Sequence, residues 1–259
     1  MAIIIKTSEE IEILREGGRR LAQVLSETAK LVKPGVSAME LETFAQEKIK
    51  ELGDTPAFLG YKPVGHRTAF PAALIVSVNA EVVHGIPTAK KILKEGDVVS
   101  LDLGLNHKGM FTDHAITLAV GGVPKEKEKL MRVTREALYE GIGAIVPGAR
   151  VGDIGHAVES YAKKNGKYGI IRTLAGHGVG RAIHEDPYVP NYGKKGTGDK
   201  LVPGMVIAIE PMFTLGSEDI IETSDGYTLK TEDGSTAAHF EHTVLVTEEG
   251  YEILTQLGP

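Results

Sequence analysis

Two stretches of the sequence run parallel, KEGDVVSLD at residues 94–102 and VPGMVIAIE at residues 202–210, and each ends on an acidic residue. With an offset of 108 residues, Glu210 aligns with Asp102, and the glycines and apolar residues before them also coincide. A carboxylate at the end of an apolar strand is destabilised by burial unless a cation compensates its charge. The repeat therefore predicts a duplicated fold whose two halves both supply carboxylates to one central metal site.

Capping sequences upstream of these strands predict pairs of helices. Thr7 and Ser37 are each followed by a glutamate three residues later, which indicates helices that run to about residue 32 and to about residue 53. A second helix pair is expected from about residue 126 to about residue 146 and then onward to residue 166. In both pairs a Pro-Gly dipeptide separates the two helices.

The two helix pairs have the same spacing and the same order relative to the acidic strands. The distance from Pro34 to Gly53 is 19 residues, and the distance from Pro147 to Gly166 is also 19. Two helices followed by strands are common, so one such match is explained by coincidence, but two in the same order favour tandem duplication. We expect one α/β (α+β) catalytic domain over residues 1–259, built from pseudo-symmetric halves at about 7–121 and 122–250.

The composition is that of an ordinary globular protein, with 42% hydrophobic and 25% charged residues among 259. A formal charge of −6 argues against a specific nucleic-acid partner, and no apolar run approaches the length of a membrane span. The absence of cysteine excludes disulfides and thiolate zinc sites. The short apolar N-terminal run does not fit a signal peptide, so we expect a cytoplasmic protein.

The segment VVSLDLGLNHKGMFTDHAITLAV, residues 98–120, is predicted to form a β-hairpin. The tetrapeptide NHKG has the chemistry of a four-residue turn, which places Leu105 opposite Met110. The same register places Asp102 directly opposite Asp113, with Cβ atoms roughly 4.5–5.5 Å apart. Two like charges among apolar neighbours are unfavourable, and a shared divalent cation relieves this repulsion. The alternative is a solvated pair at the surface.

The second half repeats this arrangement with longer side chains. Glu210 closes the strand MVIAIE, and Glu241 lies in HFEHTVLV, where FEH echoes the FTDH around Asp113. Taken alone, Glu210 also fits a buried salt bridge. Four carboxylates carry a charge of −4, which two divalent ions would neutralise, so the sequence favours a dinuclear site over a single metal.

Three of the nine histidines stand out. His177 is flanked by glycines in LAGHGVGRAIHEDP, His184 follows seven residues later, and His84 ends a predicted strand in EVVHGIP. The run GHGVG lacks the lysine and the helix of a phosphate loop, and the segment does not match HExxH, so neither site is expected. The others are assigned to solvated positions or to packing beside the ligands: His66, His107, His156, His114, His239 and His242.

Six motifs occur in the order found in the type I methionine aminopeptidases, and the chain resembles that family over nearly its whole length. The motifs are NAEVVHGIP, SLDLG, FTDHA, AGHGVGRAIHEDP, GMVIAIEP and FEHTVLV. The resemblance implies a pseudo-twofold "pita-bread" fold, in which helices cover a central, curved and mostly antiparallel sheet. Prolidases and aminopeptidases P share the metal ligands but usually carry a large N-terminal domain, for which the helix beginning near residue 7 leaves no room.

The resemblance also implies a role for each motif residue. The metal ligands would be Asp102, Asp113, His177, Glu210 and Glu241, of which Asp113 and Glu241 would bridge two divalent ions. Oxygen and nitrogen ligands allow cobalt, manganese, iron or zinc, and the sequence does not choose among them. His84 and His184 would be catalytic and bind substrate, and Glu210 would act as general base and then general acid.

The expected specificity pocket departs from the family pattern. By position, the methionine side chain would be surrounded by Tyr61, Phe70, Ile75, Ile183 and Tyr227. The family often has a cysteine at position 75 and larger aromatic residues at the last two positions, and the segment KPVGHRTAF is longer here. An apolar slot for methionine is still expected.

The expected activity is metal-dependent removal of the initiator methionine from nascent proteins whose second residue is small. The expected partners are the N-termini of nascent polypeptides, met at the ribosome, and the expected state is a monomer without membrane association. The alternatives are a Xaa-Pro aminopeptidase or prolidase-like enzyme and a non-catalytic binding protein of the same fold. A two-metal phosphoesterase is disfavoured because the sequence offers no basic phosphate clamp.

Overall fold

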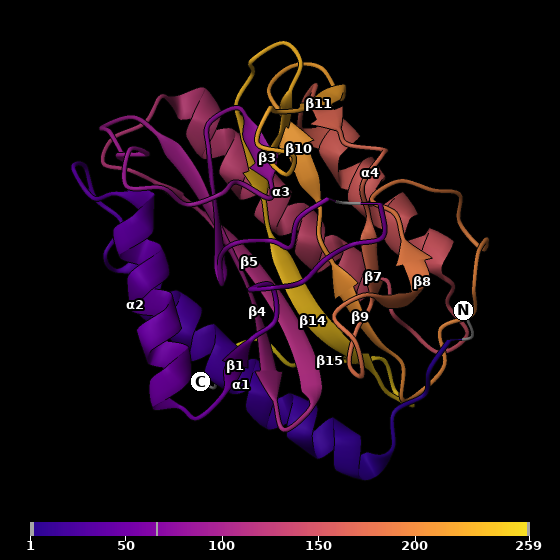
Figure 1. Cartoon of the computed structure of the whole chain (residues 1–259). Coiled ribbons are helices and arrows are strands. Elements are labelled where there is room, and N and C mark those ends of the chain that lie inside the picture. Colours follow the sequence, from indigo (N-terminus) through magenta and orange to yellow (C-terminus); the bar gives the residue numbers. More distant parts are fainter. Residues whose placement is uncertain (1–2, 66, 258–259) are drawn as a thin grey trace.

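Helices pack on one face of a large β-sheet in the computed structural model of the chain, which describes residues 3–65 and 67–257 (Figure 1). In this part of the chain the helices are α1 (Ser8–Ala29), α2 (Ala38–Glu51), α3 (Lys125–Gly143) and α4 (Val151–Asn165). None of them is both long enough and apolar enough to cross a membrane.

The first two helices begin at the predicted capping boxes. The Thr7 hydroxyl accepts the Glu10 N–H at 3.3 Å, while the Glu10 carboxylate accepts the Thr7 N–H at 2.8 Å. Ser37 and Glu40 exchange the same two bonds at 3.2 and 2.8 Å. These reciprocal bonds satisfy N–H groups that have no partner inside the helix, so they fix where each helix starts.

The large sheet has nine strands, and all of its pairings are antiparallel. Its main path runs β1-β4-β5-β14-β9-β7-β8, with β2 paired to β4 and β15 paired to β14. The strands are β1 (Thr55–Pro56), β2 (Leu74–Val78), β4 (Val98–His107), β5 (Met110–Ala119), β7 (Gly176–Gly178), β8 (Glu185–Val189), β9 (Val206–Ile209), β14 (Glu241–Val246) and β15 (Tyr251–Ile253).

Two small sheets complete the β-structure described. One has the order β13-β10-β6 and the other the order β11-β12-β3. Their strands are β3 (Glu81–Val83), β6 (Gly169–Ile170), β10 (Met212–Thr214), β11 (Ile220–Glu222), β12 (Leu229–Thr231) and β13 (Ala237–His239).

The hairpin between β4 and β5 forms as predicted, but its register is shifted by two residues. The turn contains only Lys108 and Gly109, both with positive φ (50° and 86°), so His107 rather than Leu105 pairs with Met110. A two-residue turn of this kind matches the twist of the strands better than the predicted four-residue turn. Asp102 therefore lies opposite Ala115, and Asp113 opposite Gly104, so the two carboxylates are diagonal neighbours on the same face.

Alternation along the strands separates an apolar face from an acidic face. Leu101 and Leu103 of β4 pack in an apolar cluster with residues of α1 and α2. Ile207 and Ile209 of β9 pack in a second apolar cluster with residues of α3 and α4. Successive side chains point to opposite faces of a strand, so Asp102 points away from the helices. The helices thus bury one face of the sheet and leave the carboxylates on the other.

The two halves of the chain repeat the same backbone hydrogen bonds. Leu93 N–H donates to Val36 O at 2.8 Å, and Leu201 N–H donates to Ala149 O at 2.9 Å. The turn glycines Gly96 and Gly204 have φ angles of 87° and 86°. The offset between Leu93 and Leu201 and between the glycines is the 108 residues read from the sequence. These equivalences support a duplication, and the division of the domain near residue 121 stays a prediction.

Candidate metal centre and substrate pocket

A cavity of about 270 Å³ on the acidic face of the sheet brings the predicted site residues together. Its polar lining comes from Asp102, Asp113, His177, Glu210, Glu241, His84 and His184. Its other lining residues are Phe58, Tyr61, Pro63, Phe70, Ile75 and Tyr227. No lysine or arginine is among these lining residues, so histidines are the only basic side chains among them beside the carboxylates.

Five neighbouring strands each contribute one of the predicted metal ligands. Along the order β4-β5-β14-β9-β7, these are Asp102, Asp113, Glu241, Glu210 and His177. Glu210 follows directly after the last residue of β9, and the others lie within their strands. Neighbouring strands are roughly 4.8 Å apart, so this arrangement gathers five side chains that are distant in sequence.

The His177 ring presents a lone pair to the carboxylates. Its Nδ1 lies 2.9 Å from Gly178 O, and because a carbonyl only accepts hydrogen bonds, Nδ1 carries the proton. Nε2 lies 3.6 Å from Glu210 Oε1 and 4.0 Å from Asp113 Oδ2. Burial lowers the pKa of His177 to about 3, so the ring is neutral at pH 7. A cation between Nε2 and these oxygens would turn a repulsive contact into ligation.

The four carboxylates are held in an environment that opposes their ionisation. Burial raises the pKa of Asp102 to about 7 and that of Glu210 to about 8, and it raises the pKa values of Asp113 and Glu241 well above their usual range. The charges of neighbouring carboxylates raise the pKa values of Asp113 and Glu241 further. The charge of Glu210 also raises the pKa of Asp102, whereas His239 lowers it. A bound divalent cation would reverse this preference, because it stabilises the charged forms.

The donor set fits a divalent metal. Asp102 Oδ1 and Glu241 Oε1 are buried without a hydrogen-bond partner, which is unfavourable unless another group binds them. One donor atom each of Asp113, His177 and Glu241 lie within 4.8 Å of one another. Carboxylate oxygen and imidazole nitrogen are ligands that manganese, iron, cobalt and zinc all accept. The structure therefore supports divalent metal use at this centre.

The metal-free protein is expected to lose stability as the pH rises from about 7 to about 8. In this window the carboxylates of the unfolded chain are ionised and its histidines are mostly neutral. Because the folded-state pKa values of Asp102 and Glu210 are about 7 and about 8, the folded state holds more protons than the unfolded state. Stability then falls with rising pH until these groups ionise.

Thermal unfolding of the chelated protein at the two pH values measures this effect. The Tm should be lower at the higher pH, and added Mn²⁺ should shrink the difference. A metal-free protein that is equally or more stable at about pH 8 would contradict the assigned burial of these carboxylates.

The two histidines predicted to be catalytic lie at the cavity wall. His84 has a positive φ of 59°, an unusual conformation for a residue with a side chain, and such strain clusters at functional sites. His184 Nδ1 lies 2.9 Å from the Tyr61 hydroxyl, and its ring centroid lies 4.4 Å from that of His177. The structure thus brings both histidines to the carboxylate cluster.

The structure brings four of the five residues predicted to surround the methionine side chain to the cavity wall, namely Tyr61, Phe70, Ile75 and Tyr227. Phe70 and Tyr227 pack edge to face with ring centroids 5.1 Å apart, and both line the cavity. Ile183 is not among the lining residues; it is 3% exposed and is buried behind the wall in the same apolar cluster. Phe58 and Pro63 line the cavity but were not predicted, and the only signal for them was their position two or three residues from Tyr61.

The remaining histidines have different environments. His107 was expected to be solvated, but it is 3% exposed and its Nδ1 lies 2.7 Å from Asp54 Oδ1, because the shorter turn makes it part of β4. His156 is exposed as predicted, and His66 lies outside the described residues. His239 Nε2 lies 3.5 Å from Glu210 Oε2, so it borders the centre without being a predicted ligand.

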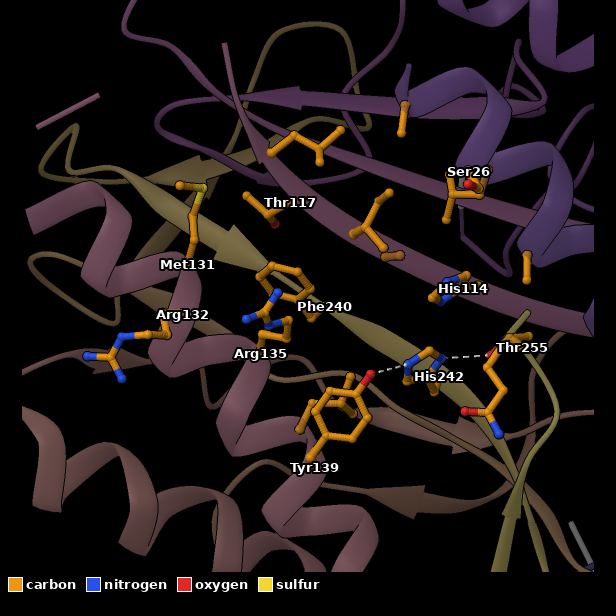
Figure 2. Close-up of a pocket in the computed structure, with 18 of the residues that line it drawn as sticks. Ser26, His114, Thr117, Met131, Arg132, Arg135, Tyr139, Phe240, His242 and Thr255 are labelled. Atoms are coloured by element: carbon orange, nitrogen blue, oxygen red, sulfur yellow. Dashed lines mark hydrogen bonds between the residues drawn. The ribbon is translucent and has the colours of Figure 1, made fainter. Parts of the chain in front are cut away.

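The opposite face of the sheet has a second, larger cavity of about 600 Å³ between α1 and α3 (Figure 2). His114 and His242 point into it, stacked with ring centroids 4.5 Å apart. Their neighbours in sequence, Asp113 and Glu241, point to the acidic face because side chains alternate along a strand. In each of the pairs Asp113-His114 and Glu241-His242, therefore, the acidic residue lines the candidate metal centre and the histidine lines the second cavity.

The fold and this centre define a metallopeptidase, and the chain belongs to metallopeptidase family M24, which matches residues 12–248. It is 49% identical over 261 residues to a methionine aminopeptidase of Aquifex aeolicus, a match that covers 99% of this chain and 100% of the relative. It is 43% identical to methionine aminopeptidase 1 of Bacillus subtilis, with 98% of this chain and 100% of the relative covered.

Solved structures show the same relationship. The crystal structure of a methionine aminopeptidase from Thermotoga maritima superposes with a TM-score of 0.93 at 45% identity, covering 98% of this chain and 100% of that one. A prolidase from Pyrococcus horikoshii superposes with a TM-score of 0.76 at 22% identity over 64% of its length, which shows the shared fold alone. The predicted pita-bread fold and the predicted family are confirmed.

Proposed function

We propose that this chain is a metal-dependent aminopeptidase that hydrolytically removes the N-terminal methionine from proteins whose second residue is small. The observation that carries the proposal is the convergence of Asp102, Asp113, His177, Glu210 and Glu241 in one cavity of a chain that is 49% identical, over nearly its whole length, to a methionine aminopeptidase. The alternative of a Xaa-Pro enzyme rests only on relatives of the same fold at 22–25% identity.

The five clustered residues would hold two divalent ions, with Asp113 and Glu241 bridging them. Four ionised carboxylates carry a charge of −4, which two divalent ions balance, whereas one ion would leave a net charge buried. Bound divalent ions would lower the pKa of an attacking water, polarise the scissile carbonyl and take the free α-amine of the substrate. Cobalt, manganese, iron and zinc all suit these donors.

Glu210 is the proposed proton carrier. It lies at the end of β9 with its carboxylate beside His177 and His239, and its pKa of about 8 in the metal-free protein shows how strongly the surroundings favour a proton on it. It would take the proton of the attacking water and deliver it to the leaving amine. A group that accepts a proton from the water and later donates it to the amine must lie within hydrogen-bond reach of both. Glu210 lines the same cavity as the apolar residues expected to hold the substrate, which would bring it close to both groups.

The two pocket histidines would contact the reacting peptide. His184 would donate a hydrogen bond to the oxygen on which charge develops, and donors of this kind act mainly on the transition state. The Tyr61 hydroxyl lies within hydrogen-bond distance of His184 Nδ1, so the other ring nitrogen, Nε2, is left to bind the substrate. His84, which also lines the cavity, would hydrogen-bond the scissile nitrogen region.

The lining of the cavity supports a preference for methionine as the first residue of the substrate. The apolar residues Tyr61, Phe70, Ile75 and Tyr227 form a slot next to the acidic cluster, suited to an unbranched apolar side chain such as methionine. Newly made proteins begin with methionine. We therefore propose that the enzyme acts in the cytoplasm, as a monomer, on the N-termini of nascent chains at the ribosome.

The proposal is tested by comparing two unblocked peptides with the metal-loaded protein. Met-Ala-Ser should be hydrolysed to methionine and Ala-Ser, whereas Ala-Pro peptides should be cleaved at least about 100-fold more slowly, because the apolar slot contributes most to binding a methionine side chain. Replacing the second residue by leucine should also slow the reaction. Faster release from Ala-Pro peptides would favour the Xaa-Pro alternative, and N-acetylated Met-Ala-Ser is the matched control that should not react.

A further inference from the structure

The N-terminal arm, residues 3–7, carries a buried lysine that the proposed reaction does not use. The Lys6 side chain is 1% exposed, and its Nζ lies 2.5 Å from Oε2 of Glu185, whose side chain is 4% exposed. The Lys6 N–H also donates to Gly204 O at 2.9 Å, which fixes the arm to the turn before β9. A buried ion pair is weak evidence for stability, because both charges lose their hydration, so its position calls for another explanation.

Glu185 joins the arm to the loop that carries His184. We define the His184 loop as residues 179–184, between β7 and β8. Glu185 follows His184 directly, and its second oxygen, Oε1, accepts the Ala182 N–H at 2.9 Å. One carboxylate therefore holds the backbone of the loop on one side and the Lys6 ammonium on the other.

The alkyl chain of Lys6 also packs directly against the loop backbone. Gly180 has φ +146°, and a Cβ at this position would lie 2.3 Å from Lys6 Cε. On its other side, Gly180 O accepts the Phe111 N–H at 2.7 Å. The loop is thus enclosed between the arm and β5, in a space that admits no side chain at Gly180.

We propose that Lys6, through its buried ion pair with Glu185, is a positioning residue that holds the His184 loop in its catalytic geometry. The inference rests on the proposed function of His184. Lys6 does not line the cavity, so it acts on substrate only through the loop. Its contribution is specific to His184, because His177 lies on β7, which is fixed by its pairing with β8 and β9.

Three variants separate positioning from stability: Lys6→Met, Glu185→Gln and the double variant. Each single change leaves one charge buried without its partner, so both should lower the Tm. The double variant removes both charges, and the amide oxygen introduced by Glu185→Gln still accepts the Ala182 N–H, so much of the Tm should return. If Lys6 positions His184, kcat for Met-Ala-Ser should stay reduced in all three, on the order of 10- to 100-fold, with KM and metal content little changed.

Arg181→Gln is the matched control. Arg181 lies in the same loop, and its Nε lies 2.6 Å from Glu10 Oε1 in a second ion pair that joins the loop to the N-terminal region. Arg181 is 49% exposed and Glu10 is 21% exposed, so water screens this pair much more than it screens the buried pair of Lys6 and Glu185, and we expect it to contribute less rigidity. Its removal should leave kcat and Tm close to those of the unchanged protein.

Hydrogen exchange measured by mass spectrometry gives a readout that does not depend on activity. Amides of residues 179–184 should exchange faster in the double variant than in the unchanged protein or in Arg181→Gln, while those of β7 should not change. Recovery of both Tm and kcat in the double variant, or unchanged exchange of the loop, would overturn the proposal. If the unchanged protein released no methionine, the proposed function would fail, and the exchange result would still decide whether Lys6 holds the loop.

Discussion

Asp113→Asn should abolish binding of two metal ions and reduce methionine release by at least about 100-fold. Asp113 is 3% exposed, and one of its oxygens lies within 4.8 Å of donor atoms of both His177 and Glu241. Asparagine keeps the shape but removes the negative charge needed to bridge two cations. Changes in residues that merely orient ligands lower metal affinity by about 10- to 100-fold, so loss of a bridging ligand should have a larger effect.

The same substitution should have the opposite effect on the stability of the metal-free protein. Burial raises the pKa of Asp113, which means that its ionised form is disfavoured in the folded state. Removing the charge should therefore raise the Tm of the chelated protein at about pH 8, while the increase in Tm on adding Mn²⁺ should become smaller.

Calorimetric metal titration, activity and unfolding of the chelated protein measure these three effects. Asp199→Asn, a change at an exposed carboxylate outside the cavity, is the control and should alter none of them. An Asp113→Asn protein that still binds two ions with unchanged affinity would refute the bridging role.

His84→Asn should lower kcat by about 100- to 1,000-fold while metal content stays the same. The proposed role of His84 is a hydrogen bond made in the transition state, and loss of one such donor has an effect of this size. Asparagine is preferred to alanine because the φ of His84 is 59°, a left-handed conformation that asparagine tolerates. KM should change little, since the bond contributes mainly after substrate has bound.

Lys108→Asn is the matched control for the backbone at His84. Lys108 has a similar φ of 50°, but it lies in the exposed turn between β4 and β5, so its replacement should leave kcat unchanged. Metal analysis and steady-state kinetics of both variants distinguish a catalytic role of His84 from a role as metal ligand. Loss of metal in His84→Asn would make His84 a ligand, and an unchanged kcat would remove it from the catalytic machinery.

The starts of the first two helices could be predicted from the sequence because they depend on local signals. Capping residues at Thr7 and Ser37 and glycines such as Gly96 and Gly204 mark positions where the backbone has few choices. The acidic residues predicted to be ligands stood out because they occur in recognisable strand motifs, and His177 stood out because glycines flank it.

The register of the hairpin was predicted wrongly, because a sequence such as NHKG is compatible with turns of two or four residues. Asn106 has a role at the turn in either case, since its side chain accepts the Gly109 N–H at 2.9 Å. The shift keeps Asp102 and Asp113 on the same face, so the prediction of a shared site survived an incorrect register.

Contacts between distant segments had no signal in the sequence. The partnership of Lys6 with Glu185 spans 179 positions, and that of His107 with Asp54 spans 53. Such pairs depend on how loops and helices close over the sheet, which neither periodicity nor turn chemistry specifies. For the same reason the order of residues did not reveal that Ile183 is buried behind the pocket wall.

Activity after removal and return of metal tests the central claim most directly. The protein is stripped with a chelator, dialysed, and assayed with Met-Ala-Ser while Mn²⁺, Fe²⁺, Co²⁺ or Zn²⁺ is added in steps. We predict no release of methionine without metal, and recovery with at least one of these ions as the carboxylate centre fills. Full activity in the chelated protein, or no release of methionine with any of the four ions, would contradict the account.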